Sequence, residues 1–282
     1  MTIPAAAETL FTIGAFPVTN SLVNGWIAAS AFAVLGFLVS RKVAAVPLGL
    51  QNAVEALLEF MLATIDGVTH DRDRSKKFLP IVGTLFLFIL VSNWMGAIPG
   101  TGTIGVWKLV HGEAELVPLF RPATSDLNLT LAMAVFAVAA SHVLGVFTIG
   151  VFKHAGKFLQ VAGIFKALKA FGKIRSPKGI GPAFLGLFIS LIELMVGLIE
   201  LVSEAAKMVS LSLRLFGNVF AGEVLLTVLY SLIAFALPLP FMFLELIVGI
   251  VQALVFSMLT LVYLTIATEP PHGEEHASEA HA

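Results

Sequence analysis

The sequence predicts an all-α integral membrane protein with about five membrane helices and one or two interfacial amphipathic helices. The chain has 282 residues, of which 58% are hydrophobic and only 12% are charged. A soluble domain carries about 25% charged residues, so this chain has too little polar surface to face water all round. Several of its apolar stretches are also long enough to cross a hydrocarbon core of about 30 Å. We expect one membrane domain over residues 1–282.

The first three spans follow from the roughly 20 apolar residues that a crossing helix needs. They are expected at residues 22–40, 78–98 and 127–152. Arg41 closes the first, and Pro99 the second. The third contains His142 as its one ionisable side chain, which we interpret as an isolated, hydrogen-bonded packing residue rather than a relay.

The segment 183–236 is too long for an upright span. It runs without a proline, and its length as a helix would be about 80 Å. It must be broken, bent or strongly inclined. A turn in ALPLP, residues 236–240, leads to a last membrane segment, 241–267, so the two form a long inclined hairpin. Residues 268–282 are expected to be a solvated tail, whose His272, His276 and His281 we interpret as solvated side chains.

Basic residues predict the orientation. Thirteen lie in the loops before the second span and before the long segment: Arg41, Lys42, Arg72, Arg74, Lys76, Lys77, Lys153, Lys157, Lys166, Lys169, Lys173, Arg175 and Lys178. The opposite side, 99–126, holds Lys108 and Arg121. The positive-inside rule therefore places the N-terminus outside and, with five crossings, the C-terminus in the cytoplasm. No basic residue precedes the first apolar residues, so we expect no cleaved signal peptide.

Two cytoplasmic stretches have an amphipathic pattern. In residues 48–66, apolar residues recur at helical spacing from Leu50 to Ile65, while Gln51, Glu55 and Glu59 form a polar stripe. This helix should lie on the membrane surface or against a partner helix. The basic loop 153–182 is weakly amphipathic, and we expect it to contact anionic headgroups.

A line of charges marks the long segment. Glu193, Glu200, Lys207 and Arg214 are seven residues apart, and a helix returns to nearly the same direction after two turns. Small or short residues lie on or near this face: Ser203, Ala206, Ser210, Gly217, Asn218 and Ala221. Such residues let another membrane helix approach closely.

The acidic residues around Arg214 are arranged differently. Glu223 is nine residues from Arg214 and should point away from it. Glu245 and Gln252 share a face of the last segment and are available to meet Glu223. An intramembrane charge costs about 2.5 to 3.5 kcal/mol on insertion scales, and arginine does not lose its proton. Arg214 therefore either holds a carboxylate anionic and blocks passing cations, or forms a structural pair with Glu223 or Glu245.

The stretch SLSLRLFGNVFAGE, residues 210–223, resembles the signature of subunit a, the membrane stator subunit of F-type ATP synthases. PATSDLNLT, residues 122–130, and VQALVFSMLTLVYL, residues 251–264, also resemble segments of that family. Asn93 lies where the family often has a polar residue, although Gly96 follows where some members have an acid.

The resemblance implies a non-catalytic, ion-translocating subunit without cofactor or metal. Arg214 would face the carboxylates of a rotating ring of subunit c, across the small residues Ala206, Ser210, Gly217 and Ala221. Two aqueous half-channels would reach the ring. Residues of the ion path would be Glu223, Glu245, Gln252, Asn218, Asp126 and Asn128, with Glu200 and Glu193 at the cytoplasmic exit.

The resemblance also implies partners and a location. The partners would be the c-ring, the peripheral stalk subunit b, the rest of the synthase and membrane lipid, without nucleic acid. The chain would lie in a bacterial inner membrane. A secondary transporter and a purely structural scaffold stay open as other functions, although no second copy of the 183–267 hairpin supports a transporter with inverted repeats. Which ion, H⁺ or Na⁺, is coupled does not follow from the sequence.

Overall fold

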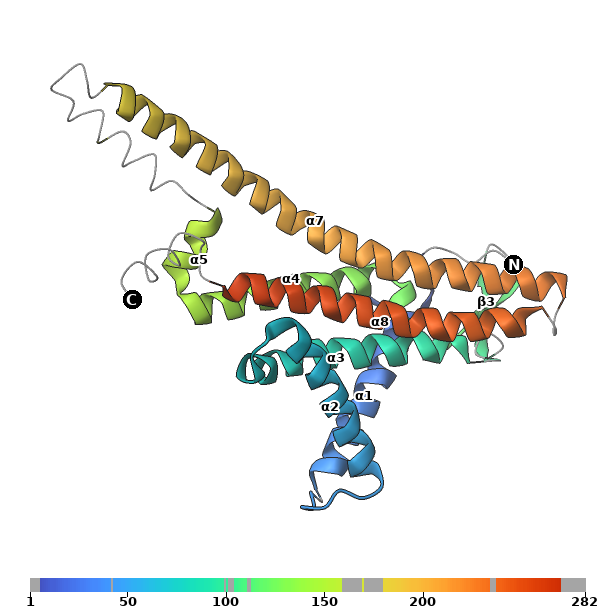
Figure 1. Cartoon of the computed structure of the whole chain (residues 1–282). Helices are drawn as coiled ribbons and strands as arrows, with labels where there is room; N and C mark the ends of the chain where they lie inside the picture. The colour runs from blue at the N-terminus through green and yellow to red at the C-terminus, as the bar shows by residue number, and fades with distance from the viewer. Residues whose placement is uncertain are drawn as a thin grey trace. The chain divides into compact units, whose positions relative to one another are not determined.

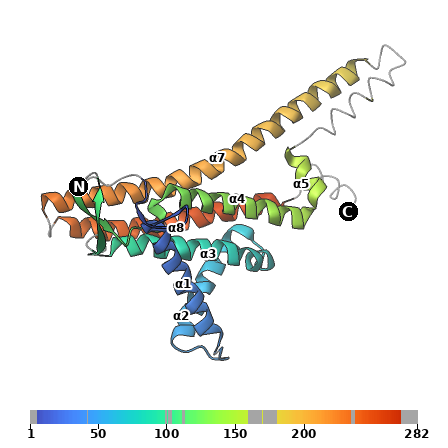
Figure 2. The ribbon, with the colours of Figure 1, turned by 180° about the vertical axis from the view of Figure 1, so that it is seen from behind.

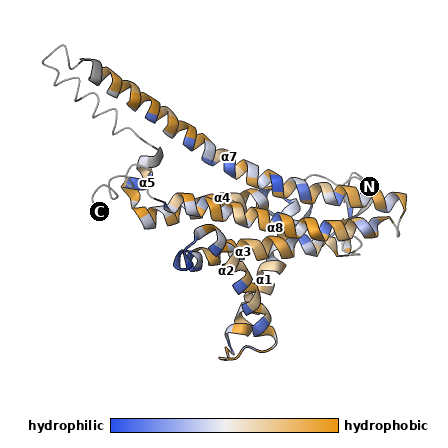
Figure 3. Cartoon of the chain, viewed as in Figure 1, coloured by the Kyte–Doolittle hydropathy of each residue, from blue (hydrophilic) through white to orange (hydrophobic). Residues whose placement is uncertain are grey.

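The structure, a computed structural model, describes residues 6–41, 43–98, 100, 104–110, 113–158, 169, 180–233 and 237–269. Within these residues the predicted all-α membrane fold is confirmed, because five helices are long and apolar enough to cross a membrane. Figure 1 shows the chain, and Figure 3 shows apolar residues along the long helices. The helices are α1 (Asn20–Ser40), α2 (Leu50–Thr69), α3 (Arg72–Ala97), α4 (Leu127–Ile149), α5 (Val151–Phe158), α7 (Ile180–Leu232) and α8 (Pro238–Thr268).

The chain divides into two compact units. The first comprises Met1–Ala137 and Ser210–Val262, and the second comprises Val138–Val209 and Tyr263–Ala282. The tail histidines and most of the basic loop lie outside the described residues.

Helix α3 begins six residues before the span predicted at 78. Asp71 explains the early start, because its Oδ1 accepts hydrogen bonds from the backbone N–H groups of Asp73 and Arg74 at 2.9 and 3.3 Å. This N-cap satisfies donors that the first turn leaves free. The charged residues 72–77, expected in a loop, therefore form the first turns of the helix.

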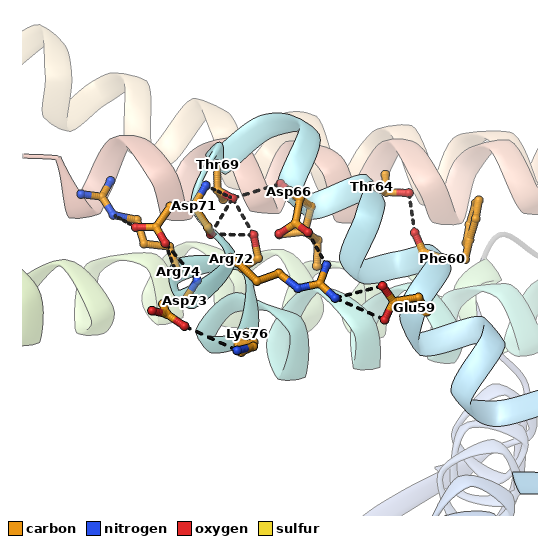
Figure 4. Close-up of polar contacts among 12 residues, drawn as sticks. Glu59, Phe60, Thr64, Asp66, Thr69, Asp71, Arg72, Asp73, Arg74 and Lys76 are labelled. Carbon is orange, nitrogen blue, oxygen red and sulfur yellow. Dashed lines mark hydrogen bonds and ion pairs between the residues drawn. The ribbon is translucent and has the colours of Figure 1, made fainter. Parts of the chain in front are cut away.

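The turn between α2 and α3 is held by polar side chains (Figure 4). Arg72 pairs with Asp66 and donates to Glu59 Oε1 at 2.9 Å. The hydroxyls of Thr69 and Ser75 lie 2.6 Å apart. Together these contacts pack the C-terminal half of α2 against α3.

The polar stripe predicted on α2 needs one correction. Gln51 is buried rather than solvated. Its amide closes a ring with the Ala44 backbone, accepting from Ala44 N at 3.0 Å and donating to Ala44 O at 2.9 Å. The apolar Leu50 and Leu58 are exposed instead. Gln51 is inside because it satisfies the backbone that leads into the helix.

The predicted third span also ends early. Helix α4 stops at Ile149, and Gly150 follows with a φ of 88°. This left-handed conformation is accessible to glycine at low cost and cannot continue a right-handed helix. A separate helix, α5, starts at Val151.

Helices α7 and α8 form the long hairpin. Helix α7 has 53 residues without interruption in its helical structure. Helix α8 begins at Pro238, inside the turn predicted at 236–240, because proline lacks only an N–H that the first helical turn leaves unused.

Two β-hairpins were not predicted. They pair β1 (Thr9–Ile13) with β2 (Phe16–Thr19), and β3 (Gly105–Val110) with β4 (Glu113–Pro118). Lys108 Nζ donates to the Thr9 carbonyl at 2.6 Å and thereby links the two hairpins. Each strand is short and pairs only with its neighbour in the chain. A search for long apolar stretches therefore does not detect these hairpins.

The core of the first unit lies where α3, α4, α7 and α8 meet. Figures 1 and 2 show α3 and α8 side by side. Side chains at every fourth position of α7, Leu211, Leu215 and Val219, are buried. On α8, Ala253 and Phe256 are buried in the same way. This packing fixes which face of α7 stays uncovered.

Candidate functional site

Arg214 lies on an uncovered face of α7. Leu211 and Leu215 point into the core, whereas Arg214 and Asn218 are exposed. The small residues predicted to accompany them are exposed as well: Ala206, Ser210, Gly217 and Ala221. A Cβ built at Gly217 meets nothing within 4 Å. Small, exposed side chains therefore surround Arg214 on this face, and another helix can approach it closely.

The guanidinium of Arg214 has no ion pair or hydrogen bond within the part of the chain that the structure describes. The structural pair with Glu223 or Glu245, left open by the sequence, is not formed. Arg214 instead borders a shallow depression together with Gln252, lined by Leu211, Leu215, Phe256 and Leu259. The charge of Arg214 is thus not compensated among the described residues.

Glu223 is paired with a different arginine. Both Nη2 and Nε of Arg121 lie 3.2 Å from Glu223 Oε2. The Arg121 side chain is only 4% exposed. Its Nε also donates to Ser125 Oγ at 3.0 Å, and its Nη1 donates to the Ala6 carbonyl at 3.1 Å. Glu223 therefore points away from the Arg214 face, as its spacing predicts, and toward the loop before α4.

Glu245 approaches α7 at a glycine. A Cβ at Gly222 would overlap both carboxylate oxygens of Glu245. Because glycine has no side chain, the Glu245 carboxylate fits against α7 at Gly222, next to Glu223 in the chain. The hairpin thus brings the two acids into one region of the first unit.

Asp126 has a clear local role. Its Oδ1 accepts from the backbone N–H of Asn128 at 2.9 Å, and its Oδ2 accepts from Ser21 Oγ at 3.0 Å. The carboxylate therefore caps α4 and ties it to α1. Asn128, two residues further along the chain, is exposed.

Asn93 joins three elements. Its Oδ1 accepts from Thr124 Oγ1 at 2.5 Å, and its Nδ2 donates to the Gly249 carbonyl at 3.3 Å. Gly96 lies against Pro122, where a Cβ would overlap the proline ring. Asn93 and Gly96 thus allow α3 to pack closely against α8 and against the segment before α4.

The second unit holds the other charged residues of α7. Glu193 and Glu200 are half-buried. Glu204 Oε1 accepts from Lys207 Nζ at 2.5 Å. The prediction that His142 is isolated is wrong, because its ring lies 3.1 Å from His154 Nε2 and 3.5 Å from Glu204 Oε2. The hydrogen bond expected for it is present.

Three residues of these arrangements were missed by sequence reasoning: Arg121, His154 and Glu204. Arg121 precedes α4 and His154 lies in the short helix α5, both outside the predicted spans, and their side-chain partners include residues far away in the chain. A signal existed for Glu204, since it stands one helical turn before Lys207 at a spacing that favours a pair.

Five apolar spans define a multi-pass membrane protein, and an arginine that has no partner among the described residues is a feature that often marks an ion path in such proteins. The particular family follows from comparison with known proteins. Residues 22–265 match the sequence model of the family described as ATP synthase A chain, and the chain belongs to this family.

Relatives cover most of the chain. ATP synthase subunit a of Moorella thermoacetica is 30% identical over 255 residues, which is 90% of this chain and 93% of that protein. The proteins of the same name from a Geobacter species and from Citrifermentans bemidjiense are 32% and 31% identical over 256 residues, 90% of this chain and 89% of each relative. The chain is thus a multi-pass membrane protein of ion transport, with other ATP synthase subunits as its partners.

Proposed function

We propose that this chain is the stator subunit that couples ion flow to rotation, with Arg214 facing the carboxylates of a rotating c-ring. One observation carries the proposal. Arg214 is exposed and unpaired within the described residues, on a face built of small side chains. One acid of its own hairpin, Glu223, is already paired with Arg121.

The free-energy cost of an uncompensated arginine in a membrane supports a partner on another chain. A guanidinium stays charged at every accessible pH, and exposing it to lipid costs about 2.5 to 3.5 kcal/mol or more. A second chain that carries a carboxylate at membrane depth would offset this cost. The small residues beside Arg214 would let such a helix come close.

The remaining residues take roles along two aqueous half-channels. Glu223, Glu245 and Gln252 would line the outer half-channel, with Asp126 and Asn128 near its mouth and Asn218 beside the ring. Glu200 and Glu193 would mark the cytoplasmic exit. Each elementary charge that crosses releases about 2.3 kcal/mol per 100 mV. The chain itself would carry no nucleotide chemistry, which belongs to other subunits.

The proposed setting is a bacterial inner membrane, with the N-terminus outside and the C-terminus in the cytoplasm. Burial of Arg121 in an ion pair supports this orientation. It leaves Lys108 as the one remaining basic side chain of the described outer loop, against the many on the opposite side. Subunit b and membrane lipid would cover other exposed apolar faces.

The test is Arg214→Ala in the assembled synthase. We expect ATP-driven ion pumping and coupled ATP synthesis to be lost, while the complex still assembles and co-purifies with a ring of small hydrophobic subunits. Pumping is measured by fluorescence quenching in inverted membrane vesicles. Arg74→Ala, which removes an exposed arginine at the α2–α3 turn, is the matched control and should pump normally.

Other outcomes would favour the other functions. Loss of assembly without a specific loss of pumping would indicate a scaffold. Solute transport by the isolated chain would indicate a secondary transporter. Coupled pumping retained in Arg214→Ala would remove this arginine from the mechanism.

A further inference from the structure

A fixed positive charge lies beside the acids of the α7–α8 hairpin. Arg121, in the segment before α4, directs two nitrogens at one oxygen of Glu223, since Nε and Nη2 both lie 3.2 Å from Glu223 Oε2. Arg121 therefore engages one side of this carboxylate and leaves Oε1 to other partners. The function proposed above assigns a role to Glu223 but none to Arg121.

Arg121 is held at several points apart from Glu223. Its backbone carbonyl accepts from Asn24 Nδ2 of α1 at 2.8 Å. Its Nε donates to Ser125 Oγ at 3.0 Å, and its Nη1 donates to the Ala6 carbonyl at 3.1 Å. The buried Nη2 has no hydrogen-bond partner within the described part of the chain. The guanidinium is therefore fixed in position, and its charge is compensated by the Glu223 carboxylate.

Glu245 is the second charged group that acts on Glu223. It comes from α8, and its carboxylate lies so close to Gly222 that a Cβ there would overlap both of its oxygens. Arg214 is on the same helix as Glu223 but on the face that points away from it. We call Glu223 and Glu245 the acid pair. The charged groups that face Glu223 are thus Arg121, from the segment before α4, and Glu245, from α8.

These three side chains have unequal charges. Two ionised carboxylates carry two negative charges, and Arg121 carries one positive charge that it keeps at every accessible pH. The single negative charge that remains is balanced by one further cation. Without Arg121, the acid pair would hold a cation more tightly, because an opposite charge within about 4–6 Å changes the hold of a carboxylate on a proton by about 1–3 pH units. Since a transported ion must also be released, the fixed charge favours transfer over storage.

A purely structural ion pair is the alternative. Such a pair often contributes no more to stability than apolar residues of similar volume would. It also needs neither a second acid nearby nor a glycine that admits this acid, and both are present at Gly222. The arrangement therefore favours a role in the ion path.

We propose that Arg121 is a positioning residue of the ion path, which serves as the fixed counter-ion of Glu223 and limits the acid pair to one transported cation at a time. This inference rests on the proposed function, in which the acid pair lines the outer half-channel. An arriving proton forms an O–H bond with one of the two carboxylates and leaves when that bond breaks. Arg121 keeps its own protons throughout.

The experiment measures ATP-driven pumping per assembled complex in inverted membrane vesicles over a range of pH. In Arg121→Gln, we expect pumping at the optimum pH of the parent to fall at least about tenfold and the optimum to rise by about one pH unit or more, because the acid pair releases its cation less readily. Arg121→Lys keeps the charge and should keep the optimum of the parent. Lys108→Gln, which removes another cation that contacts the N-terminal segment, is the matched control and should pump normally.

A compensating variant separates charge from structure. Glu245→Gln alone leaves Arg121 balanced by Glu223, without a negative charge for a transported cation, and should also lose pumping. The double variant Arg121→Gln with Glu245→Gln leaves Glu223 as a single acid and restores one net negative charge. We expect the double variant to pump several-fold better than either single variant, although the ion pair of Arg121 with Glu223 stays broken in it.

Three results would overturn the role of Arg121: normal pumping in Arg121→Gln, a loss of pumping without a shift of the optimum pH, or a double variant that pumps no better than the single ones. Should Arg121→Gln not assemble, pumping by the double variant supports this role and its absence contradicts it. Arg214→Ala, run in parallel, distinguishes the two proposals. If it pumps, the proposed function fails, and if it is silent while Arg121→Gln pumps like the parent, only the role of Arg121 fails.

Discussion

At the scale of single residues, the two arginines of the first unit have opposite environments. Arg121 is buried and has hydrogen-bond or ion-pair partners in Glu223, Ser125 and Ala6. Arg214 is exposed and has none among the described residues. Because both side chains are permanently charged, the charge of Arg121 is compensated within the fold, whereas that of Arg214 is not compensated among the described residues.

Arg121→Gln tests the compensation of the Arg121 charge. Breaking a buried ion pair leaves an uncompensated charge on Glu223 and costs about 3–5 kcal/mol. We expect a lower thermal unfolding midpoint for the purified complex. The double variant Arg121→Gln with Glu223→Gln removes both charges and should recover most of that loss. Lys108→Gln, in the same loop, is the control. A double variant that is less stable than Arg121→Gln would contradict the pairing.

Gly222→Ala tests how the Glu245 carboxylate is placed. The added methyl group would overlap the far end of a flexible side chain, so the strain is relieved by moving the carboxylate, and the loss of stability should stay at the lower end of the about 1–3 kcal/mol that overpacking costs. Pumping should nevertheless fall, because Glu245 leaves its position beside Glu223. Gly36→Ala, in open space on α1, is the control. Unchanged pumping in Gly222→Ala would show that this position is not needed.

At the scale of elements, the α2–α3 turn shows how exposed charges act as a group. Each surface ion pair contributes little by itself. At this turn Arg72 engages Glu59 and Asp66 together, while Asp71 caps α3. The Ser75 hydroxyl and the Arg72 guanidinium lower the pKa of Asp66 below its ordinary value of 3.8.

This shift predicts a pH dependence. A carboxyl with a lower pKa in the folded state stabilises the fold fully above its unfolded pKa, and the contribution is lost as the pH falls through the folded pKa. Asp66→Asn should therefore speed hydrogen exchange in residues 66–77 at pH 7, and the difference from the parent should vanish below the lowered pKa. Asp73→Asn is the control. A difference that persists unchanged in acid would mean that the Asp66 charge is not its cause.

At the scale of the whole molecule, the uncovered face of α7 predicts where the ring docks. The chain has no cysteine, so single cysteines can be introduced without background. We expect cysteines at Ser210, Gly217 and Ala221 to form cross-links with cysteines placed on the ring subunit. A cysteine at the buried Leu215 should not. Cross-linking that does not distinguish these positions would contradict docking on this face.

Periodicity and composition were sufficient for the spans, the hairpin and the line of charges, because burial in lipid imposes about 20 apolar residues on each crossing and helical geometry decides which side chains share a face. The family signature around Arg214 was also visible in the sequence. Boundaries were less predictable, since they depend on a cap such as Asp71 or on the φ of Gly150.

The sequence by itself determined an all-α membrane protein of the ATP synthase A chain family and the charged, small-residue face of α7. Only the tertiary structure decided the pairings. Arg121 with Glu223, and His142 with His154 and Glu204, join residues from different elements. Helical spacing relates side chains within one helix, whereas a partner on another helix is chosen by packing, and that choice left Arg214 without a carboxylate in the described chain.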